Sequence, residues 1–421
     1  MSPRIGSFSK VSVAIIGAGL AGLACARTLA QHGIDSQIFE SSDGVGGRVR
    51  TDEVDGYRLD RGFQILLTAY PEVGRSLELD ALEMRYFERG AVVRISGENF
   101  HVADPLSNPH LLFQTMRAPI GSIADKLRLL ALVASARRGS VNDLLHRSDT
   151  STLDLLNKRR FSKRMIQNFW QPLFSGIQLD PDLEVSSLRF LLILRMLASG
   201  ASGVPARGMG EITKQLASLL APGTLHLEAR AVAVSGSHVI IDGGTTITAD
   251  AVVVATDGPS ASRLLDIPDP GSRSTSCIWF SADAPPSGIG KFIALDGARD
   301  SLVRNLAVMS GVSEQYAPAG KSLIAASIPG SAGGERLEAE VRSHLSSWIG
   351  AEVQSWETLR IDRIMHGHPD QRAPLQARQR VNLGDGLWVC GDHRDTASIQ
   401  GAMFSGRRTG EAIAASLGIR N

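Results

Sequence analysis

The chain has little cysteine, few aromatic residues and almost no excess charge. Its three cysteines, Cys25, Cys277 and Cys390, are too far apart for a disulfide framework or a CxxC metal pair, which fits a reducing cytoplasm and predicts no metal site. Lys and Arg total 44 against 43 for Asp and Glu, so no nucleic acid partner is indicated. No apolar run reaches 18 residues, so no segment is predicted to span a bilayer.

Glycine is the residue in excess, with 43 in 421 residues, roughly 10% against the usual value of about 7%. Residues 11–16 form a short run of β-branched character, and Gly17, Gly19 and Gly22 follow it as GxGxxG. Apolar residues then recur at helical spacing until Gly33. A second strand is expected over 34–40. This strand–turn–helix–strand order predicts the opening of a Rossmann-type unit.

The GxGxxG segment indicates a dinucleotide site. Gly17 permits the tight turn, Gly19 lets the backbone approach a pyrophosphate, and Gly22 lets helix and strand pack closely. The start of the helix, including Ala21, offers free N–H groups to the phosphates. Glu40 lies 18 residues beyond Gly22, where a carboxylate can accept hydrogen bonds from a ribose 2′-hydroxyl.

A second glycine turn follows Glu40 at once. Gly46 and Gly47 allow close backbone approach, and Arg48 brings a fixed cation to the same phosphate region. With this GGR segment the chain resembles the flavoprotein superfamily that contains amine oxidases, protoporphyrinogen oxidases, and carotenoid desaturases and isomerases. The resemblance implies FAD as the cofactor, bound without a covalent link. Attachment through Cys390 is the alternative.

Three further stretches carry the resemblance. Residues 56–64 are similar to the stretch that runs into the isoalloxazine ring, residues 228–234 to the middle FAD segment, and residues 387–406 to the closing FAD motif. The resemblance implies that the backbone of Val232 holds the adenine and that the helix after the closing motif faces the flavin pyrimidine. The implied cofactor contacts are Gly62, Phe63, Gln64, Val232, Gly391, Asp392, Ile399 and Gln400.

The order of these segments predicts an α/β protein with two domains. A Rossmann-type FAD-binding domain is expected from three discontinuous segments, 1–75, 206–270 and 361–421. An inserted α+β substrate-binding domain is expected over 76–205 and 271–360. Its helical part at 105–200 is expected to form the substrate pocket, whose apolar character favours a hydrophobic small molecule.

The most apolar segment is 188–198, which Arg189 and Arg195 interrupt. One interpretation is a core helix of the inserted domain. The other is a surface that touches a membrane or a lipid-like substrate.

Some residues depart from the amine oxidase pattern. Ile399 stands where those enzymes usually place a tyrosine, and the strand expected at 274–280 lacks their lysine, although Lys291 lies close by. A conventional aromatic cage for an amine is therefore not expected. Weak catalytic candidates are Gln64, His366 and His368, and a structural role for the two histidines is the alternative.

The chain is therefore expected to be an FAD-dependent oxidoreductase. It would transfer a hydride from an isoprenoid, tetrapyrrole or amine-like substrate to flavin N5. Oxygen or a quinone would reoxidise the flavin, since no second GxGxxG indicates a nicotinamide site. A redox-neutral isomerase similar to carotene isomerases is one alternative, and a non-catalytic carrier similar to GDP-dissociation inhibitors is another. The expected location is the cytoplasm, with or without peripheral membrane contact. Nothing in the sequence indicates an oligomeric state.

Overall fold

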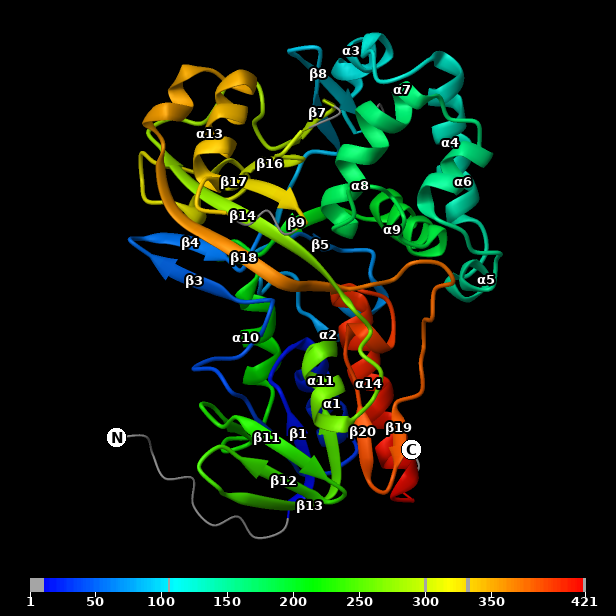
Figure 1. Cartoon of the computed structure of the whole chain (residues 1–421), viewed down its shortest axis with the longest axis vertical. Coiled ribbons are helices and arrows are strands. Elements are labelled where there is room, and N and C mark those ends of the chain that lie inside the picture. Colours follow the sequence, from blue (N-terminus) through cyan, green and yellow to red (C-terminus); the bar gives the residue numbers. More distant parts are fainter. Residues whose placement is uncertain (1–10, 105–106, 299–300, 331–333, 419–421) are drawn as a thin grey trace.

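A computed structural model describes residues 11–104, 107–298, 301–330 and 334–418. The molecule is elongated, and two layers of sheet and helix are stacked along its long axis (Figure 1). The lower part holds an eight-stranded sheet and the upper part a seven-stranded sheet with a group of helices beside it. The α/β fold class predicted from the sequence is confirmed.

Three distant segments of the chain build the lower sheet. Its parallel strands run in the order β10-β2-β1-β13, and β20 pairs with β13 on the other side. These strands are rich in Val and Ile, as expected where helices cover both faces of a parallel sheet. Their bounds are β1 (Val11–Ile16), β2 (Ser36–Phe39), β10 (Leu225–His226), β13 (Thr246–Val254) and β20 (Leu387–Val389). The short strand β19 (Asn382–Gly384) pairs with β20 in the antiparallel direction.

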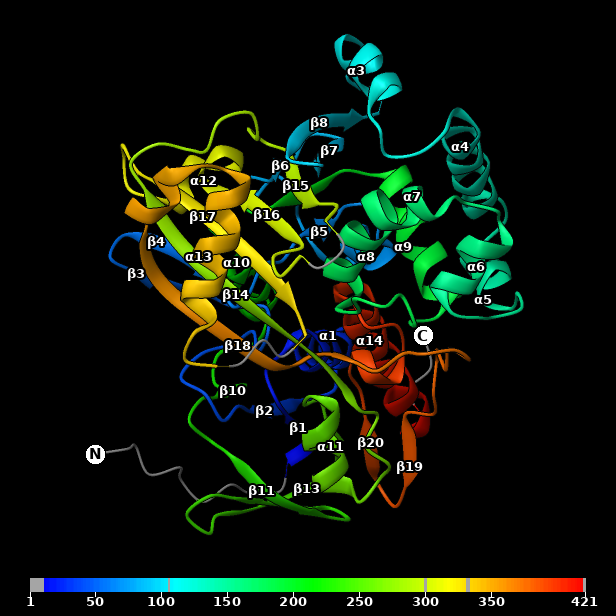
Figure 2. The same cartoon turned by 45° about the horizontal axis from the view of Figure 1, so that its top comes forward.

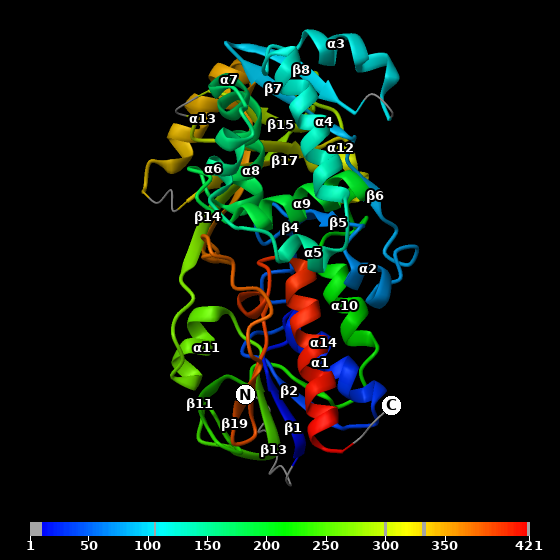
Figure 3. The same cartoon turned by 90° about the vertical axis from the view of Figure 1, so that its right-hand side faces the viewer.

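Helices cover both faces of this sheet (Figure 3). On one face α1 (Leu20–Gln31) lies beside α14 (Ile399–Ser416), with α10 (Gly210–Ser218) next to them, and α11 (Gly258–Leu265) lies on the other face. Small residues bring α1 and α14 together, since a Cβ at Gly406 would lie 2.1 Å from the carbonyl oxygen of Ala21. This close packing joins the first and last segments of the chain.

An antiparallel hairpin extends the lower sheet. It consists of β11 (Ala231–Ser235), β12 (His238–Ile241) and the first half of β13. Gly243 and Gly244 form its turn with φ of +88° and +90°, which side chains rarely adopt.

The upper sheet has the order β18-β14-β17-β16-β15-β7-β8. Its strands are β7 (Gly90–Ile95), β8 (Glu98–Ala103), β14 (Ser272–Ala282), β15 (Ile293–Asp296), β16 (Asn305–Val308), β17 (Ser322–Pro329) and β18 (Glu357–Pro369). The boundary predicted at residue 361 is wrong in one respect, because it would cut β18. That strand pairs with β14 from Ser281 to Ser272 and belongs to this sheet along its length.

Short elements connect the two layers. The hairpin of β3 (Thr51–Val54) and β4 (Tyr57–Asp60) and the small sheet of β5 (Leu66–Leu67), β6 (Arg85–Tyr86) and β9 (Ser202–Val204) lie between them. The helices α2 (Pro71–Ser76), α12 (Met309–Val312) and α13 (Leu337–Trp348) complete the core of the molecule.

The helical group contains α3 (Leu112–Arg117), α4 (Ile123–Arg137), α5 (Val141–Leu145), α6 (Thr152–Lys158), α7 (Lys163–Met165), α8 (Gln171–Gln178) and α9 (Ser187–Ser199). α3 projects from the rest of the molecule at the top of Figure 2, next to α4. α9 is buried along most of its length, and the ring of Phe190 packs 4.3 Å from Phe174 and 5.4 Å from Trp170. This burial fits the core-helix interpretation of 188–198. In the part of the chain that the structure describes, no helix is long and apolar enough to cross a membrane.

Candidate functional site

A cavity of about 920 Å³ connects the two layers of the molecule. One end lies at the carboxyl ends of β1 and β2, at Ile16 and Phe39, where parallel sheets commonly bind ligands. The other end reaches α8 and α9 in the helical group. Most of the cofactor contacts predicted from the sequence line this cavity.

The first glycine turn leaves open space beside the cavity. No described atom lies within 4 Å of a Cβ built on Gly19, which precedes α1 as its N-cap without a side-chain partner. A Cβ on Gly22 would instead lie 2.0 Å from the carbonyl oxygen of Gly17, so Gly22 serves the packing of helix against strand. Gly17 itself has a φ of +104°. The space at Gly19 fits a phosphate group next to the positive end of α1.

Glu40 holds the first glycine turn and the start of the second in place at the β1–β2 end of the cavity. Its carboxylate accepts hydrogen bonds from the backbone N–H of Ala18 at 2.7 Å and from the N–H and hydroxyl of Ser42 at 2.9 and 2.8 Å. Oε1 accepts both bonds from Ser42, whereas Oε2 accepts only the bond from Ala18, so Oε2 keeps a lone pair for a ribose hydroxyl. Gly46 donates to the carbonyl of Ala18 at 2.9 Å, which fixes the second glycine turn against the first.

Arg48 and Asp392 meet across the middle of the cavity wall. The two guanidinium NH₂ groups of Arg48 donate to the two carboxylate oxygens of Asp392 at 3.0 and 2.7 Å, and one also donates to the carbonyl of Gly367 at 2.7 Å. Burial alone would raise the pKa of Asp392, but the charge and hydrogen bonds of Arg48 outweigh it and lower this pKa. Both side chains were predicted cofactor contacts, and their direct pairing was not foreseen.

The predicted flavin-lining stretch borders the cavity at Gly62, Phe63 and Gln64. The amide nitrogen of Gln64 donates to the carbonyls of Arg48 at 2.7 Å and Arg61 at 2.8 Å. Gln64 therefore ties this stretch to the second glycine turn, and its amide hydrogens are already used.

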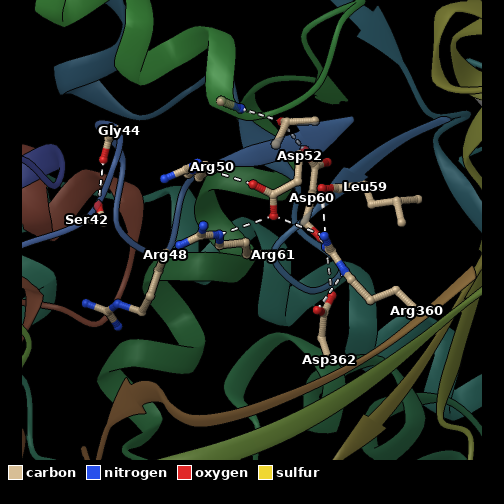
Figure 4. Close-up of polar contacts among 12 residues, drawn as sticks. Ser42, Gly44, Arg48, Arg50, Asp52, Leu59, Asp60, Arg61, Arg360 and Asp362 are labelled. Carbon is tan, nitrogen blue, oxygen red and sulfur yellow. Dashed lines mark hydrogen bonds and ion pairs between the residues drawn. The ribbon is translucent and has the colours of Figure 1, made fainter. Parts of the chain in front are cut away.

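An ion-pair network lies next to the stretch of Gly62, Phe63 and Gln64 (Figure 4). Asp52 pairs with Arg50 at 3.3 Å, Arg61 at 3.4 Å and Arg360 at 3.0 Å. Arg360 also donates to the backbone carbonyl of Asp60 at 2.7 Å. Because Arg360 comes from β18, this network anchors the hairpin β3–β4 to the upper sheet.

The remaining predicted contacts divide into two groups. Gly391, Ile399 and the half-exposed Val232 line the cavity. Gln400 is not among the lining residues, and its side chain accepts a hydrogen bond from the N–H of Glu72 at 2.9 Å, which fixes α2. The predicted cofactor contact of Gln400 is thus not supported by its side chain.

The two candidate histidines lie in different places. His366 is exposed, its ring pairs with the hydroxyl of Ser272 at 2.8 Å, and it does not line the cavity. His368 lines the cavity, but Arg189 donates to its Nδ1 at 3.0 Å. Burial first and the neighbouring Arg189 second lower the pKa of His368 to about 3, so this imidazole is neutral at physiological pH. The structural alternative is therefore favoured for His366, and His368 is poorly suited to act as a base.

The sequence predicted a pocket from the helical part at 105–200 but did not identify the individual residues that form the walls of the far end. Leu173 and Ile177 of α8 and Ile193 and Leu197 of α9 supply apolar surface there. Polar side chains contributed by the upper sheet also line it, at Thr275, Asn305 and Ser327, and Tyr70 and Arg189 complete the set. The spacing of four residues from Arg189 to Ile193 to Leu197 was a usable signal, since such residues share one helix face. Among the described residues, no group of three His, Cys, Asp or Glu side chains could hold a metal ion.

Comparisons with known proteins give the relationships of the chain. The model of the flavin-containing amine oxidoreductase family matches residues 20–414. A ζ-carotene-forming phytoene desaturase of Myxococcus xanthus is 40% identical over 72 residues, which are 16% of this chain and 14% of that protein. Protoporphyrinogen oxidase 2 of Arabidopsis thaliana is 37% identical over 183 residues, 42% of this chain and 35% of that protein. Both aligned segments thus span well under two thirds of the relatives.

A solved structure shows the same fold over nearly the whole chain. An oxidoreductase from Methanosarcina mazei superposes with a TM-score of 0.72 at 19% identity, covering 95% of this chain and 100% of that one. Such a low identity supports the fold and not a particular reaction.

Proposed function

The chain belongs to the flavin-containing amine oxidoreductase family, and from this premise we propose that it is an FAD-dependent oxidoreductase acting on an organic, mainly apolar substrate. A bound flavin would supply the hydride acceptor at N5, and oxygen or a quinone would take the electrons from it. The observation that carries the proposal is a continuous cavity, which joins the open space beside Gly19 to the apolar walls of α8 and α9.

The chain offers a binding group for each part of FAD. Glu40 would accept hydrogen bonds from the adenosine ribose, and Val232 would border the adenine. The turns at Gly19 and Gly47 would receive the pyrophosphate. The side chains of Arg48 and Asp392 would rearrange to contact the phosphate and ribityl groups. Gly62, Phe63 and Ile399 would border the ring.

Non-covalent binding is supported by the positions of the cysteines. Cys390 is fully buried and, within the described chain, no cysteine lines the cavity. We also propose that the lower layer acts as the FAD-binding domain and the upper layer as the substrate-binding domain. The last segment of the FAD-binding domain then begins after the end of β18 and not at residue 361.

A redox-neutral isomerase uses the same cofactor site, so the experiment must separate it from an oxidoreductase. The purified protein is denatured, the released flavin is identified by chromatography, and the holoenzyme is mixed anaerobically with candidate isoprenoids, tetrapyrroles and amines. Loss of flavin absorbance at 450 nm on adding substrate alone supports the oxidoreductase. Conversion of substrate without net bleaching supports the isomerase. A colourless protein that does not bind added FAD overturns the proposal and favours a carrier.

The surface of α3 and α4 supports peripheral contact with a membrane. Ile123, Leu127 and Leu130 lie on one face of α4 and are 66%, 61% and 64% exposed, and Phe113 of α3 is 63% exposed. Residues 107–165 carry eleven Lys and Arg against four Asp, in a chain of net charge +1. Exposed apolar side chains in a segment rich in Lys and Arg match an anionic lipid surface, and we propose that this α3–α4 face docks on one.

A further inference from the structure

Arg189 is a buried cation in the wall of the cavity. Arg189 lies on the same face of α9 as Ile193 and Leu197, and it is 1% exposed. The proposed function does not use it. A charged group at this depth is costly unless it is paired or serves a ligand.

Within the described part of the chain, no carboxylate contacts Arg189 directly. The Nη2 group of Arg189 donates to Nδ1 of His368 at 3.0 Å and to the carbonyl of Ala397 at 2.9 Å, and both acceptors are neutral groups. Its Nε and Nη1 atoms have no hydrogen-bond partner among the described residues.

The nearby carboxylates are already paired with other arginines. Asp392 is held at both oxygens by Arg48, and Asp180 pairs with Arg273 at 2.8 Å. Burial lowers the pKa of Arg189 to about 10, which leaves the side chain protonated at physiological pH. Among the described residues, Arg189 therefore has no ion-pair partner of its own, and Asp392 and Asp180 act on its charge only from a distance.

Two further groups in the same corner favour a negatively charged ligand, one through a helix dipole and one as a hydrogen-bond donor. The carbonyl that Arg189 contacts belongs to Ala397, one residue before Ser398, which caps the 18-residue helix α14. Ile399 and Ala402 of its first turn line the cavity, so the positive end of the helix faces it. The hydroxyl of Tyr70 belongs to this corner as well, and burial raises its pKa to about 12, so it stays a neutral donor.

We propose that Arg189, together with the start of α14, makes this corner of the cavity a binding site for negative charge. The inference rests on the proposed function and narrows it. The charge has two possible sources, a carboxylate on an otherwise apolar substrate or the negative charge that a flavin ring carries when reduced. A substrate with an acidic group on an apolar body fits the cavity, whereas a cationic amine is repelled.

The first arm of the test compares three ten-carbon probes, decanoate, decanol and decylamine. Their binding to the oxidised holoenzyme is followed by the change in the flavin spectrum and by calorimetry. We expect decanoate to bind at least tenfold more tightly than decanol, and decylamine most weakly. Arg189→Met removes this preference, and Arg189→Lys retains part of it.

The matched control is Arg195→Met. Arg195 is on the same helix, donates to the carbonyl of Ala136 at 3.4 Å and does not line the cavity, so its loss leaves the preference unchanged. If Arg189→Met does not fold, Arg189→Gln replaces it, because the amide keeps donors without the charge.

The second arm measures the flavin midpoint potential in the same variants. If the reduced ring is the source, Arg189→Met weakens binding of reduced relative to oxidised flavin by about tenfold, which corresponds to a potential lower by roughly 30 mV. A lost decanoate preference with an unchanged potential assigns the charge to the substrate, and the reverse assigns it to the flavin. Unchanged preference and unchanged potential in Arg189→Met overturn the proposal.

Failure of the proposed function gives a different result. A wild-type protein that binds no flavin refutes the proposed function, while calorimetry with the three probes still tests the corner. Equal affinity for decanoate, decanol and decylamine in that protein refutes the anionic corner as well.

Discussion

Arg48 and Asp392 form a bidentate ion pair, although they are 344 positions apart in the sequence. This pair joins the second glycine turn to the closing segment of the chain. Asp392 is 4% exposed, so its charge depends on this partner. The pair lies in the cavity wall at the place where the proposed phosphate and ribityl groups bind. It therefore keeps the site assembled in the absence of the cofactor.

Removing one partner of this pair is expected to destabilise the fold more than removing both. Arg48→Met leaves a buried carboxylate unpaired and lowers the free energy of unfolding by about 2–3 kcal/mol, at the low end for buried pairs because Arg48 is partly exposed. The double variant with Asp392→Asn recovers most of that loss. Urea unfolding of the four proteins of this cycle measures it. Additive losses would show that the pair carries no coupling.

Gly19 and Gly22 are expected to respond to substitution in opposite ways. Gly19→Val meets no described atom within 4 Å at its Cβ, so the protein folds, but the side chain fills the proposed pyrophosphate space and FAD is lost. Gly22→Ala drives a Cβ to 2.0 Å from the carbonyl oxygen of Gly17, so the fold itself is destabilised. Flavin absorbance per protein and the circular dichroism melting curve separate the two effects. A yellow Gly19→Val protein contradicts the assignment.

The sequence predicts those parts of the site that depend on residues close together in the chain, and it does not predict those that depend on packing between distant segments. Gly19, Gly22 and Glu40 act through backbone geometry and chemistry within one strand–turn–helix unit, which a sequence pattern records directly. The contact of Arg189 with His368 spans 179 positions and depends on how α9 packs against β18. Nothing local to either residue encodes it. Gln400 shows the converse case, since a motif position suggests a cofactor contact, which stays a prediction, while packing directs the side chain toward α2.

Glu40→Ala is expected to weaken FAD binding through the loss of a charged acceptor worth about 1.5–3 kcal/mol, or roughly 10- to 150-fold in the dissociation constant. The matched variant Glu40→Gln retains an acceptor oxygen for the N–H of Ala18 and is expected to lose less. Equilibrium dialysis of the reconstituted proteins gives both constants. Equal FAD affinity in all three proteins would place the ribose elsewhere.

His393 is expected to make the protein sensitive to acid. Its ring nitrogens have no hydrogen-bond partner among the described residues, and burial lowers its pKa to about 4. The unfolded chain binds this proton near pH 6.5, so stability is full above that pH and falls as the pH drops toward 4. Between pH 7.5 and 5 the loss from this group is about 2 kcal/mol.

The matched variant isolates the contribution of this histidine. His393→Leu removes its share of the acid sensitivity but leaves that of His368, whose pKa is lowered to about 3. Urea unfolding at both pH values, with FAD at a fixed concentration, measures the difference between wild type and variant. An identical pH dependence of the two proteins would contradict the expected titration.

The α3–α4 face is expected to bind vesicles that contain anionic lipid. In α4, Ile123, Leu127 and Leu130 recur at the spacing that normally faces a core, yet they face solvent, while the acidic side chain of Asp125 is buried. Docking would bury these apolar groups and bring Lys and Arg residues of the same basic segment near the lipid phosphates. Leu127→Glu removes one apolar anchor worth about 1.5–3 kcal/mol, so vesicle binding falls by tenfold or more.

A leucine elsewhere on the surface provides the control for this last expectation. Leu219 follows α10 in the lower layer and is 55% exposed, so Leu219→Glu adds the same charge without touching the proposed face. Co-sedimentation with phosphatidylcholine vesicles, with and without phosphatidylglycerol, compares the three proteins at low and high salt. Because electrostatic attraction is screened, wild-type binding should weaken with salt as well as with loss of the anionic lipid. If both leucine variants bind as well as wild type, the exposed residues of α3 and α4 do not meet a membrane, and their apolar face must serve another contact.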